Sequence, residues 1–222
     1  VYYFVFQSAF MPTKISGIDA LQDIRNMMER SSRFISLSGW SGIAAGTCAL
    51  IGSWMGWSRI RAYYAHEYSQ ANQCPVCLRT DLVGIAAGVF LTALLTAFFF
   101  TYLRSKKDGV AIWGNAARRL LWNTAIPLLV GAIFIGRLLQ QQQYELVPAA
   151  SLIFYGMALL NGSRYTLGEV KWLGLAEILT GLVCLWYPRS GIYFWAFGFG
   201  LLHIIYGFSM WWKYERRETG KS

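Results

Sequence analysis

Two ionisable side chains, Glu177 and His203, lie inside runs of sequence that are otherwise apolar. Glu177 interrupts "WLGLAEILTGLV", and His203 interrupts "GFGLLHIIYG". At 1.5 Å per helical residue, Glu177 lies about 9 Å from Lys171, near the start of its run. By the same measure His203 lies about 12 Å from Trp211, so the two side chains are nearly level on neighbouring antiparallel helices. We therefore expect them to face each other.

A buried pair of this kind has two interpretations. An ionisable group inside a membrane costs several kcal/mol unless it is paired, neutral or in contact with water, so such groups are candidates for function. A Glu/His pair can bind or relay a proton near neutral pH. The alternative is an interhelical hydrogen bond that locks two helices together, with Glu177 protonated.

Further polar side chains fall toward the same half of the apolar runs: Asn123, Tyr155, Asn161, Tyr206 and Ser209. They predict either the polar lining of an inward-facing cavity or hydrogen bonds between helices. An Asn in a short apolar helix joins helices more often than it binds a ligand.

A CxxC motif, Cys74 and Cys77, lies in a polar stretch between two apolar runs. In an oxidising compartment on the outer side of the membrane, such a pair forms a structural disulfide, remains as two unused thiols or exchanges disulfides. A zinc site is a further alternative, but the motif supplies only two of about four ligands, and His66 stands at an unusual spacing. We expect no bound metal and no cofactor.

The elements that position these residues are apolar helices. The chain is 55% hydrophobic and only 14% charged, whereas soluble domains have about 25% charged residues. A spanning helix needs about 20 mainly apolar residues. The qualifying segments are Phe34 to Trp57, Leu82 to Leu103, Leu120 to Leu139, Tyr144 to Gly162, Val170 to Tyr187 and Ile192 to Trp212.

The predicted fold class is therefore all-α, a polytopic membrane bundle of six transmembrane helices arranged as three hairpins. An N-terminal segment, residues 1–33, precedes it. Ser16 and Asp19 begin an amphipathic surface helix there, with Ile18, Leu21 and Ile24 on one face. The transmembrane domain covers residues 34–212, and residues 213–222 form a basic cytoplasmic tail.

Small residues recur at four-residue intervals inside the apolar segments. The pentapeptide "GIAAG" occurs twice, at residues 42–46 and 84–88. Such spacings allow helix backbones to approach closely in a membrane. We expect both copies to make helix contacts within one chain rather than between two chains.

The sequence excludes several classes of function. It contains no Walker motif, GxSxG, HExxH or dinucleotide fingerprint, so a conventional hydrolase or ATP-driven pump is not expected. The net charge is +9, but the basic residues are spread along the chain and do not form the patch that nucleic acid requires. The expected partner is the lipid bilayer, and no protein partner is indicated.

The last two hairpins resemble each other in the placement of Gly131, Gly156, Gly181 and Gly207 and in one Pro at each outer turn. The stretch "LAEILTGLVCLWYPRSGIYFWAFGFGLLHIIYGF" resembles the hairpin repeat of the HdeD-type acid-resistance membrane proteins, a bacterial six-span family implicated in tolerance of low pH. With "MERSSRFISLSGWSGIAAG", the chain is also similar to small bacterial six-span membrane proteins of unknown activity. These resemblances imply a multi-pass protein of the bacterial inner (cytoplasmic) membrane.

The function expected from the sequence is that of an integral inner-membrane protein without enzymatic activity, stress-linked or proton-sensitive through Glu177 and His203. A small secondary transporter or channel is the alternative, because internal repeats and intramembrane polar groups are typical of such proteins. A membrane thiol oxidoreductase that uses Cys74 and Cys77 is a further alternative.

The distribution of positive charge generates a topology prediction. Of the 20 Lys and Arg residues, only Arg59, Arg61, Arg79, Arg189 and Arg137 fall toward the outer side if the N-terminus is inside. Loops rich in Lys and Arg stay on the cytoplasmic side of the membrane. We therefore expect a reporter fused after Ser222 to lie in the cytoplasm and a reporter inserted near Asn72 to lie on the external side. An external reading after Ser222 would invert the whole map.

Overall fold

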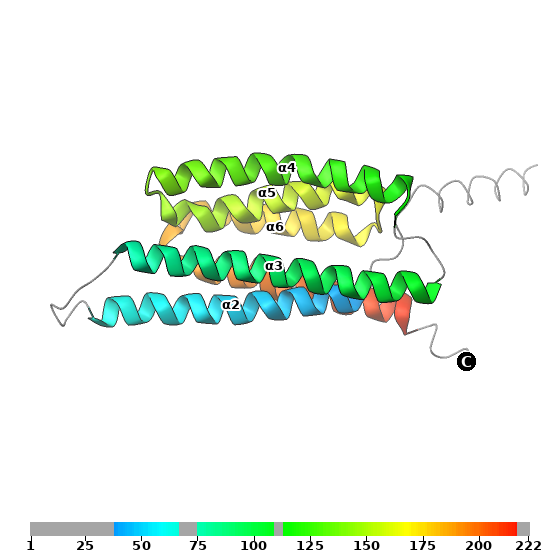
Figure 1. The fold of residues 1–222 in the computed structure, drawn as a ribbon, viewed down its shortest axis with the longest axis horizontal. Coiled ribbons are helices and arrows are strands. Elements are labelled where there is room, and N and C mark those ends of the chain that lie inside the picture. The colour runs from blue at the N-terminus through cyan, green and yellow to red at the C-terminus, as the bar shows by residue number, and fades with distance from the viewer. Residues whose placement is uncertain (1–37, 67–74, 109–112, 217–222) are drawn as a thin grey trace, which may run out of the picture.

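The computed structural model describes residues 38–66, 75–108 and 113–216 (Figure 1), and every regular element in these ranges is helical. The predicted all-α class is confirmed. The elements are α2 (Gly39–His66), α3 (Pro75–Asp108), α4 (Asn115–Gln140), η1 (Tyr144–Leu146), α5 (Val147–Gly162), η2 (Ser163–Tyr165), α6 (Glu169–Trp186) and η3 (Pro188–Ser190). A last continuous helix follows, composed of α7 (Gly191–Trp195), η4 (Ala196–Leu202), α8 (His203–Met210) and η5 (Trp211–Glu215).

Four of these helical segments are long and apolar enough to cross a membrane: Val76–Lys107, Asn115–Gln140, Tyr144–Tyr165 and Pro188–Tyr214. α2 and α6 do not belong to this set. α2 has 28 residues, but its glycine, serine and tryptophan residues lower the mean hydropathy. α6 has 18 residues, which span about 27 Å, and it carries Glu169, Lys171 and Glu177.

The described helices extend beyond the predicted apolar segments. α2 continues past Trp57 to His66, and α3 begins at Pro75 rather than Leu82. Much of the expected first outer loop is therefore helix, because a helix satisfies its own backbone hydrogen bonds in water as well as in lipid. The predicted N-terminal segment 1–33 with its surface helix lies outside the described residues, as do residues 217–222 of the tail.

The helices form two groups (Figure 1). In one group α5 packs between α4 and α6, and in the other α2 packs between α3 and the last helix. The third predicted hairpin is thus divided between the groups, since α6 packs mainly on α5 and the last helix mainly on α2. We use the name seam for the smaller contact of α5 and α6 with α7, η4 and α8.

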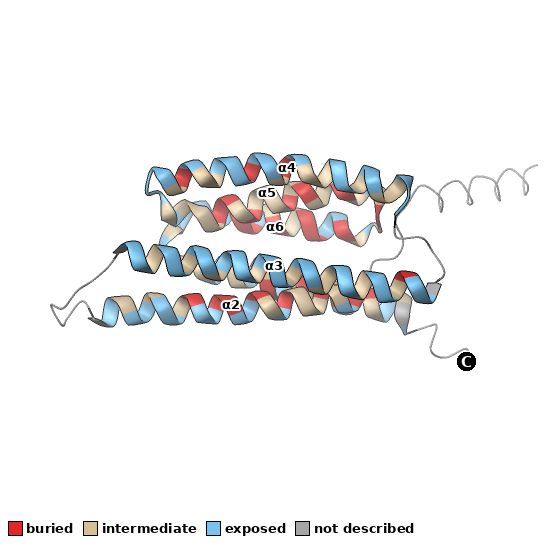
Figure 2. Cartoon of the chain, in the orientation of Figure 1, coloured by how far each residue is buried: buried red, intermediate tan, exposed pale blue. Residues whose placement is uncertain are grey.

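Close backbone approach explains this grouping. A Cβ atom at Gly156 of α5 would lie 2.7 Å from the carbonyl oxygen of Gly174 on α6. A Cβ atom at Gly46 of α2 would lie 2.6 Å from the carbonyl oxygen of Gly200 on the last helix. Buried residues concentrate on α5 and α6 and along one side of α2 (Figure 2). The glycines therefore select each helix's partner.

The two GIAAG segments differ in their surroundings. The segment at 42–46 packs against the last helix, as expected. At Gly84 and Gly88, in contrast, a Cβ atom would meet nothing within 4 Å. Ile85 of the second segment still packs toward α2, where a Cβ atom at Gly52 would lie 3.8 Å from its side chain. Among the described residues, therefore, the contact of this segment with α2 is made by Ile85, and its two glycines do not bring helix backbones together.

This difference generates a paired prediction. In lipid-free detergent, Gly46→Leu should destabilise the protein by about 3 kcal/mol, because the added side chain meets backbone that cannot move aside. Gly88→Leu, the matched change in the same pentapeptide, should leave the thermal midpoint unchanged or raise it, since Leu favours helix more than Gly does. Equal destabilisation by both changes would contradict the described packing of α2.

Candidate functional site

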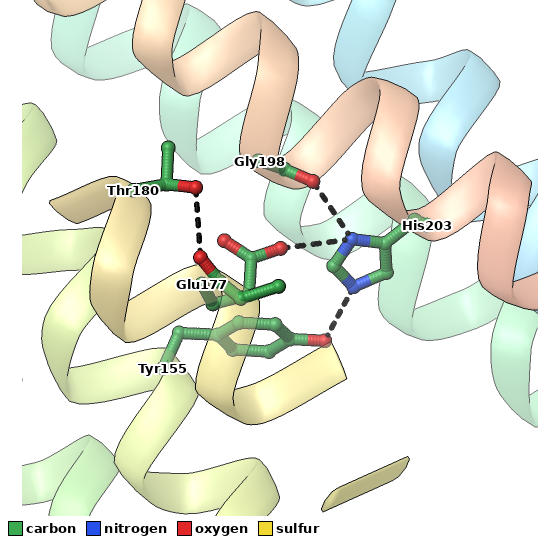
Figure 3. Close-up of polar contacts among 6 residues, drawn as sticks. Tyr155, Glu177, Thr180, Gly198 and His203 are labelled. Atoms are coloured by element: carbon green, nitrogen blue, oxygen red, sulfur yellow. Dashed lines mark hydrogen bonds and ion pairs between the residues drawn. The ribbon is translucent and has the colours of Figure 1, made fainter. Parts of the chain in front are cut away.

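Glu177 and His203 lie together in the seam (Figure 3). The Glu177 side chain is 0% exposed and the His203 residue 6% exposed. Glu177 belongs to the middle of α6, and His203 is the first residue of α8. His203 Nδ1 lies 3.3 Å from Glu177 Oε1. The two groups thus meet across the seam rather than inside either helical group.

Tyr155 of α5 is the third member of this arrangement. Its hydroxyl lies 2.9 Å from His203 Nε2. Its ring packs 5.1 Å from the ring of Phe199 and 5.4 Å from the His203 imidazole, measured between ring centroids. Tyr155, His203 and Glu177 form what we name the Tyr–His–Glu cluster, which joins α5, α6 and the last helix.

The carbonyl of Gly198 fixes the tautomer of His203. His203 Nδ1 lies 3.2 Å from the Gly198 carbonyl oxygen. A carbonyl oxygen can only accept a hydrogen bond, so Nδ1 must carry a proton and donate. When the imidazole is neutral, Nε2 then holds a lone pair and accepts from the Tyr155 hydroxyl. When the imidazole is protonated, Nε2 donates to the same hydroxyl.

The Glu177 carboxyl group has few polar neighbours. Within the described ranges, neither of its oxygens has a hydrogen-bond partner of good geometry, although Nδ1 lies at ion-pair distance from Oε1. The Thr180 hydroxyl, one turn away, donates to the Ala176 carbonyl oxygen of its own helix at 2.7 Å. An isolated carboxylate in such a place would be very costly, so the carboxyl group is either protonated or paired with an imidazolium.

The backbone of the last helix brings its carbonyl to this position. Gly198 and Gly200 belong to η4, a π-helical segment of seven residues, which widens the helix beside Glu177. A Cβ atom at Gly198 would lie 2.6 Å from Glu177 Oε2. Only glycine therefore lets η4 approach the carboxyl group. Segments of π-helix occur often at functional sites.

The other predicted polar residues do not join the cluster. Asn123 of α4 donates to the carbonyl oxygen of Arg119 on its own helix at 2.7 Å. Asn161 and Ser209 are exposed. Tyr206 lies one turn beyond His203, and its hydroxyl is buried with no hydrogen-bond partner in the described part of the chain. Of the five residues predicted as polar lining, the structure brings Tyr155 alone into hydrogen-bond contact with the pair.

A second polar contact crosses from α6 to the last helix at the end of the bundle where η5 lies. Lys213 and Tyr214 of η5 both donate hydrogen bonds to Glu169 Oε1, the Tyr214 bond at 3.0 Å. Partial burial raises the pKa of Glu169, but these bonds and a backbone hydrogen bond outweigh it and hold that pKa below its ordinary value. Glu169 therefore stays ionised at neutral pH.

The cysteine motif lies far along the chain from this cluster. Cys77 belongs to the first turn of α3 and is disulfide-bonded, whereas Cys74 lies outside the described residues. Cys48 and Cys184 are free. Among the described residues, no group of three or more His, Cys, Asp or Glu side chains is arranged to hold a metal ion.

Sequence reasoning placed Glu177 and His203 at one level but did not anticipate two features of the site. The role of Tyr155 as the partner of Nε2 depends on which face of α5 meets the seam. The acceptor at Gly198 depends on the π-helical turn. The glycine pair Gly198 and Gly200, five and three residues before His203, was the available signal.

Comparison of the chain with protein-family models, with curated proteins and with solved structures finds no significant match.

The geometry of the cluster predicts the effect of removing one hydroxyl. Tyr155→Phe keeps the ring packing but leaves a buried imidazole nitrogen without a partner, which should cost about 1 to 3 kcal/mol. The measurement is the thermal midpoint in detergent. Tyr187→Phe is the matched control, because Tyr187 is exposed and should tolerate the loss. Equal stability of Tyr155→Phe and wild type would show that the hydrogen bond to Nε2 is not formed.

Proposed function

We propose that the protein is an integral membrane protein whose Tyr–His–Glu cluster makes it sensitive to protons. The observation that carries this proposal is a fully buried carboxyl group whose nearest titratable partner is an imidazole 3.3 Å away. The number of protons bound by Glu177 and His203 therefore sets the net charge of the buried pair. Because this pair lies in the seam, its charge acts on the contact between the two helical groups.

The membrane arrangement supports the same proposal. We infer six spans, with α2 and α6 crossing beside the four more apolar helices. α2 packs along the last helix, and α6 packs along α5. Both of these neighbours are apolar enough to span a membrane. The charge distribution favours cytoplasmic termini and, with the family resemblance, the bacterial inner membrane.

The cluster is most stable when its net charge is zero. A neutral cluster contains one titratable proton, held either by Glu177 beside a neutral imidazole or by His203 beside a carboxylate. Loss of that proton leaves a buried negative charge, and gain of another leaves a buried positive charge. Either state is costly in a buried site. The packing of the seam therefore depends on pH.

The titratable groups that face Glu177 are His203 from the last helix and Tyr155 from α5. Tyr206 lies one turn closer to Glu169, Lys213 and Tyr214. A change in pH from 5 to 8 leaves tyrosine hydroxyls protonated and Lys213 charged in ordinary surroundings. Because the pKa of Glu169 is held below its ordinary value, this side chain stays ionised and paired with Lys213 throughout that range. The Glu177 and His203 pair therefore dominates the response above pH 5.

A proton-coupled transporter is the second candidate. An ionisable pair between two helical groups suits alternating access, in which one group rocks against the other. The described cavity between α2 and α3 is lined by none of the cluster residues, so it offers no route to the pair. Proton flux across liposomes that contain the protein, lost in Glu177→Gln, would favour the transporter over a sensor.

The proposal predicts opposite pH dependences for two proteins. Above about pH 6.5 an unfolded chain releases the titratable proton from both Glu and His. The proposal has the folded pair keep one proton, because the neutral pair is the least costly state of this buried site. Wild-type stability should therefore fall as pH rises. Glu177→Gln keeps no such proton, so its stability should be flat above about pH 6.5 and should fall on acidification, when the unfolded histidine binds a proton.

Thermal unfolding in detergent between pH 5 and 8 measures these slopes. Glu145→Gln, which removes an exposed carboxyl group, is the matched control and should keep the wild-type slope. Glu177→Leu should be less stable than Glu177→Gln by about 1 to 3 kcal/mol, because Leu cannot interact with the imidazole. Parallel slopes for wild type and Glu177→Gln would refute proton sensitivity at this pair.

A further inference from the structure

A cavity of about 600 Å³ lies between α2 and α3, away from the Tyr–His–Glu cluster. Its size is within the range of about 300 to 1,000 Å³ that small-molecule sites occupy. The α3 side includes Gly84 and Gly88, where a side chain would meet nothing within 4 Å. The rest of its apolar wall comes from Cys48, Ile51, Met55, Ile85 and Val89.

Charge is confined to one end of this cavity. Arg59 of α2 and Asp81 of α3 line it, with Arg59 Nη1 3.6 Å from Asp81 Oδ2 and the two side chains 64% and 47% exposed. That separation exceeds the usual hydrogen-bond distance of about 2.7 to 3.2 Å, so both groups keep capacity for a further partner.

The remaining polar side chains of the cavity are already satisfied. The Thr80 hydroxyl donates to the Val76 carbonyl oxygen at 2.9 Å, and the Thr92 hydroxyl donates to the Gly88 carbonyl oxygen at 2.7 Å. The cavity is therefore an apolar groove with a positive and a negative group at one end. This distribution of polarity matches that of an amphipathic molecule.

The charged end also lies where a bilayer surface would meet α3. Asp81 directly precedes the apolar run from Leu82 to Leu103, which contains no charged residue. Those residues span about 33 Å as a helix, close to the thickness of about 30 Å of the hydrocarbon core. The apolar part of the groove would thus lie in the hydrocarbon, and the ion pair at the headgroup level.

We propose that this groove binds one phospholipid of the surrounding bilayer, with an acyl chain against Gly84 and Gly88 and a zwitterionic headgroup at Arg59 and Asp81. The proposal rests on the proposed membrane-spanning arrangement of α2 and α3. A guanidinium pairs with phosphate through charge-assisted hydrogen bonds, and a carboxylate pairs with a primary ammonium. The two groups together therefore complement phosphatidylethanolamine.

A second copy of the chain is the competing occupant. The first GIAAG segment accepts a helix because its partner contributes glycine backbone at Gly200 and Gly207. The second segment differs in opening onto a groove with an ion pair at its end. A flexible acyl chain fills such a groove, whereas a helix from a second copy would have to bring complementary charges as well.

Native mass spectrometry of the full-length protein, titrated in detergent with phosphatidylethanolamine or phosphatidylglycerol, tests the proposal. We expect wild type to bind one phosphatidylethanolamine in preference. The double variant Gly84→Leu, Gly88→Leu fills the groove where the fold has space and should weaken this binding by about tenfold or more. Gly136→Leu is the matched control, because Gly136 also faces open space but lies on α4.

The headgroup contacts are tested separately. Arg59→Gln should weaken the binding of both lipids by about tenfold, the equivalent of one charge-assisted hydrogen bond. Asp81→Asn should shift the preference toward phosphatidylglycerol, because it removes the partner of the ammonium and leaves the guanidinium unpaired. Unchanged lipid binding in the double Leu variant would overturn the proposal, as would a wild type that binds neither lipid.

Two further outcomes separate this proposal from its alternatives. A wild-type dimer that the double Leu variant converts to a monomer would overturn it in favour of a second copy in the groove. A failure of the proposed function would appear elsewhere, in the topology reporters or in the pH slopes of Glu177→Gln, which the groove variants leave untouched. If topology and pH slopes hold while the Leu variants bind lipid normally, the lipid site alone is refuted.

Discussion

A carboxyl group that has lost contact with water has to be neutral or paired, and Glu177 imposes this constraint on the seam. His203 supplies the pairing group, but an imidazole is useful here only in one orientation. The Gly198 carbonyl oxygen, 3.2 Å from Nδ1, sets that orientation, and Tyr155 satisfies the other ring nitrogen at 2.9 Å. The π-helical turn of η4 follows from the same need, because it places Gly198 beside the carboxyl group.

The two helical groups are held together by different forces from those that act within each group. Inside the groups, glycines allow backbones to touch at Gly156 and Gly174 and at Gly46 and Gly200, and such contacts do not depend on pH. Across the α6 interface with the last helix, the described residues add the polar contacts of Glu177 and Glu169. A change in protonation therefore acts at the smaller contact between the two groups, which opposes a movement less than the contacts within each group do. This separation makes the seam the natural place for a response.

The sequence predicts the position of a residue along its helix axis. Depth along a helix follows from residue counts, so the common level of Glu177 and His203 was predictable. Rotation about a helix axis was not, and it separates Tyr155, which meets the imidazole, from Asn161, which is exposed. The division of the third hairpin between the two groups could not be predicted either, because it depends on contacts between glycines that are far apart in the chain, such as Gly46 and Gly200. The lengthening of α2 and α3 past the apolar segments has a simpler cause, because hydropathy marks the extent of the membrane and not the ends of helices.

The two GIAAG segments show how the position of a helix decides what a motif does. Gly42 and Gly46 lie on α2, which has a neighbouring helix on each side. Because these two residues have no side chains, the backbone of the last helix packs directly against them. Gly84 and Gly88 lie on α3 at the edge of the group, with no helix against them in the described residues. In a bilayer an edge helix is solvated by lipid, whose chains are as apolar as leucine. A lipid chain can fill a groove left by missing side chains at such an edge without breaking any hydrogen bond. The same pentapeptide can thus join two helices inside the bundle and, at the edge of the bundle, offer a contact surface to lipid.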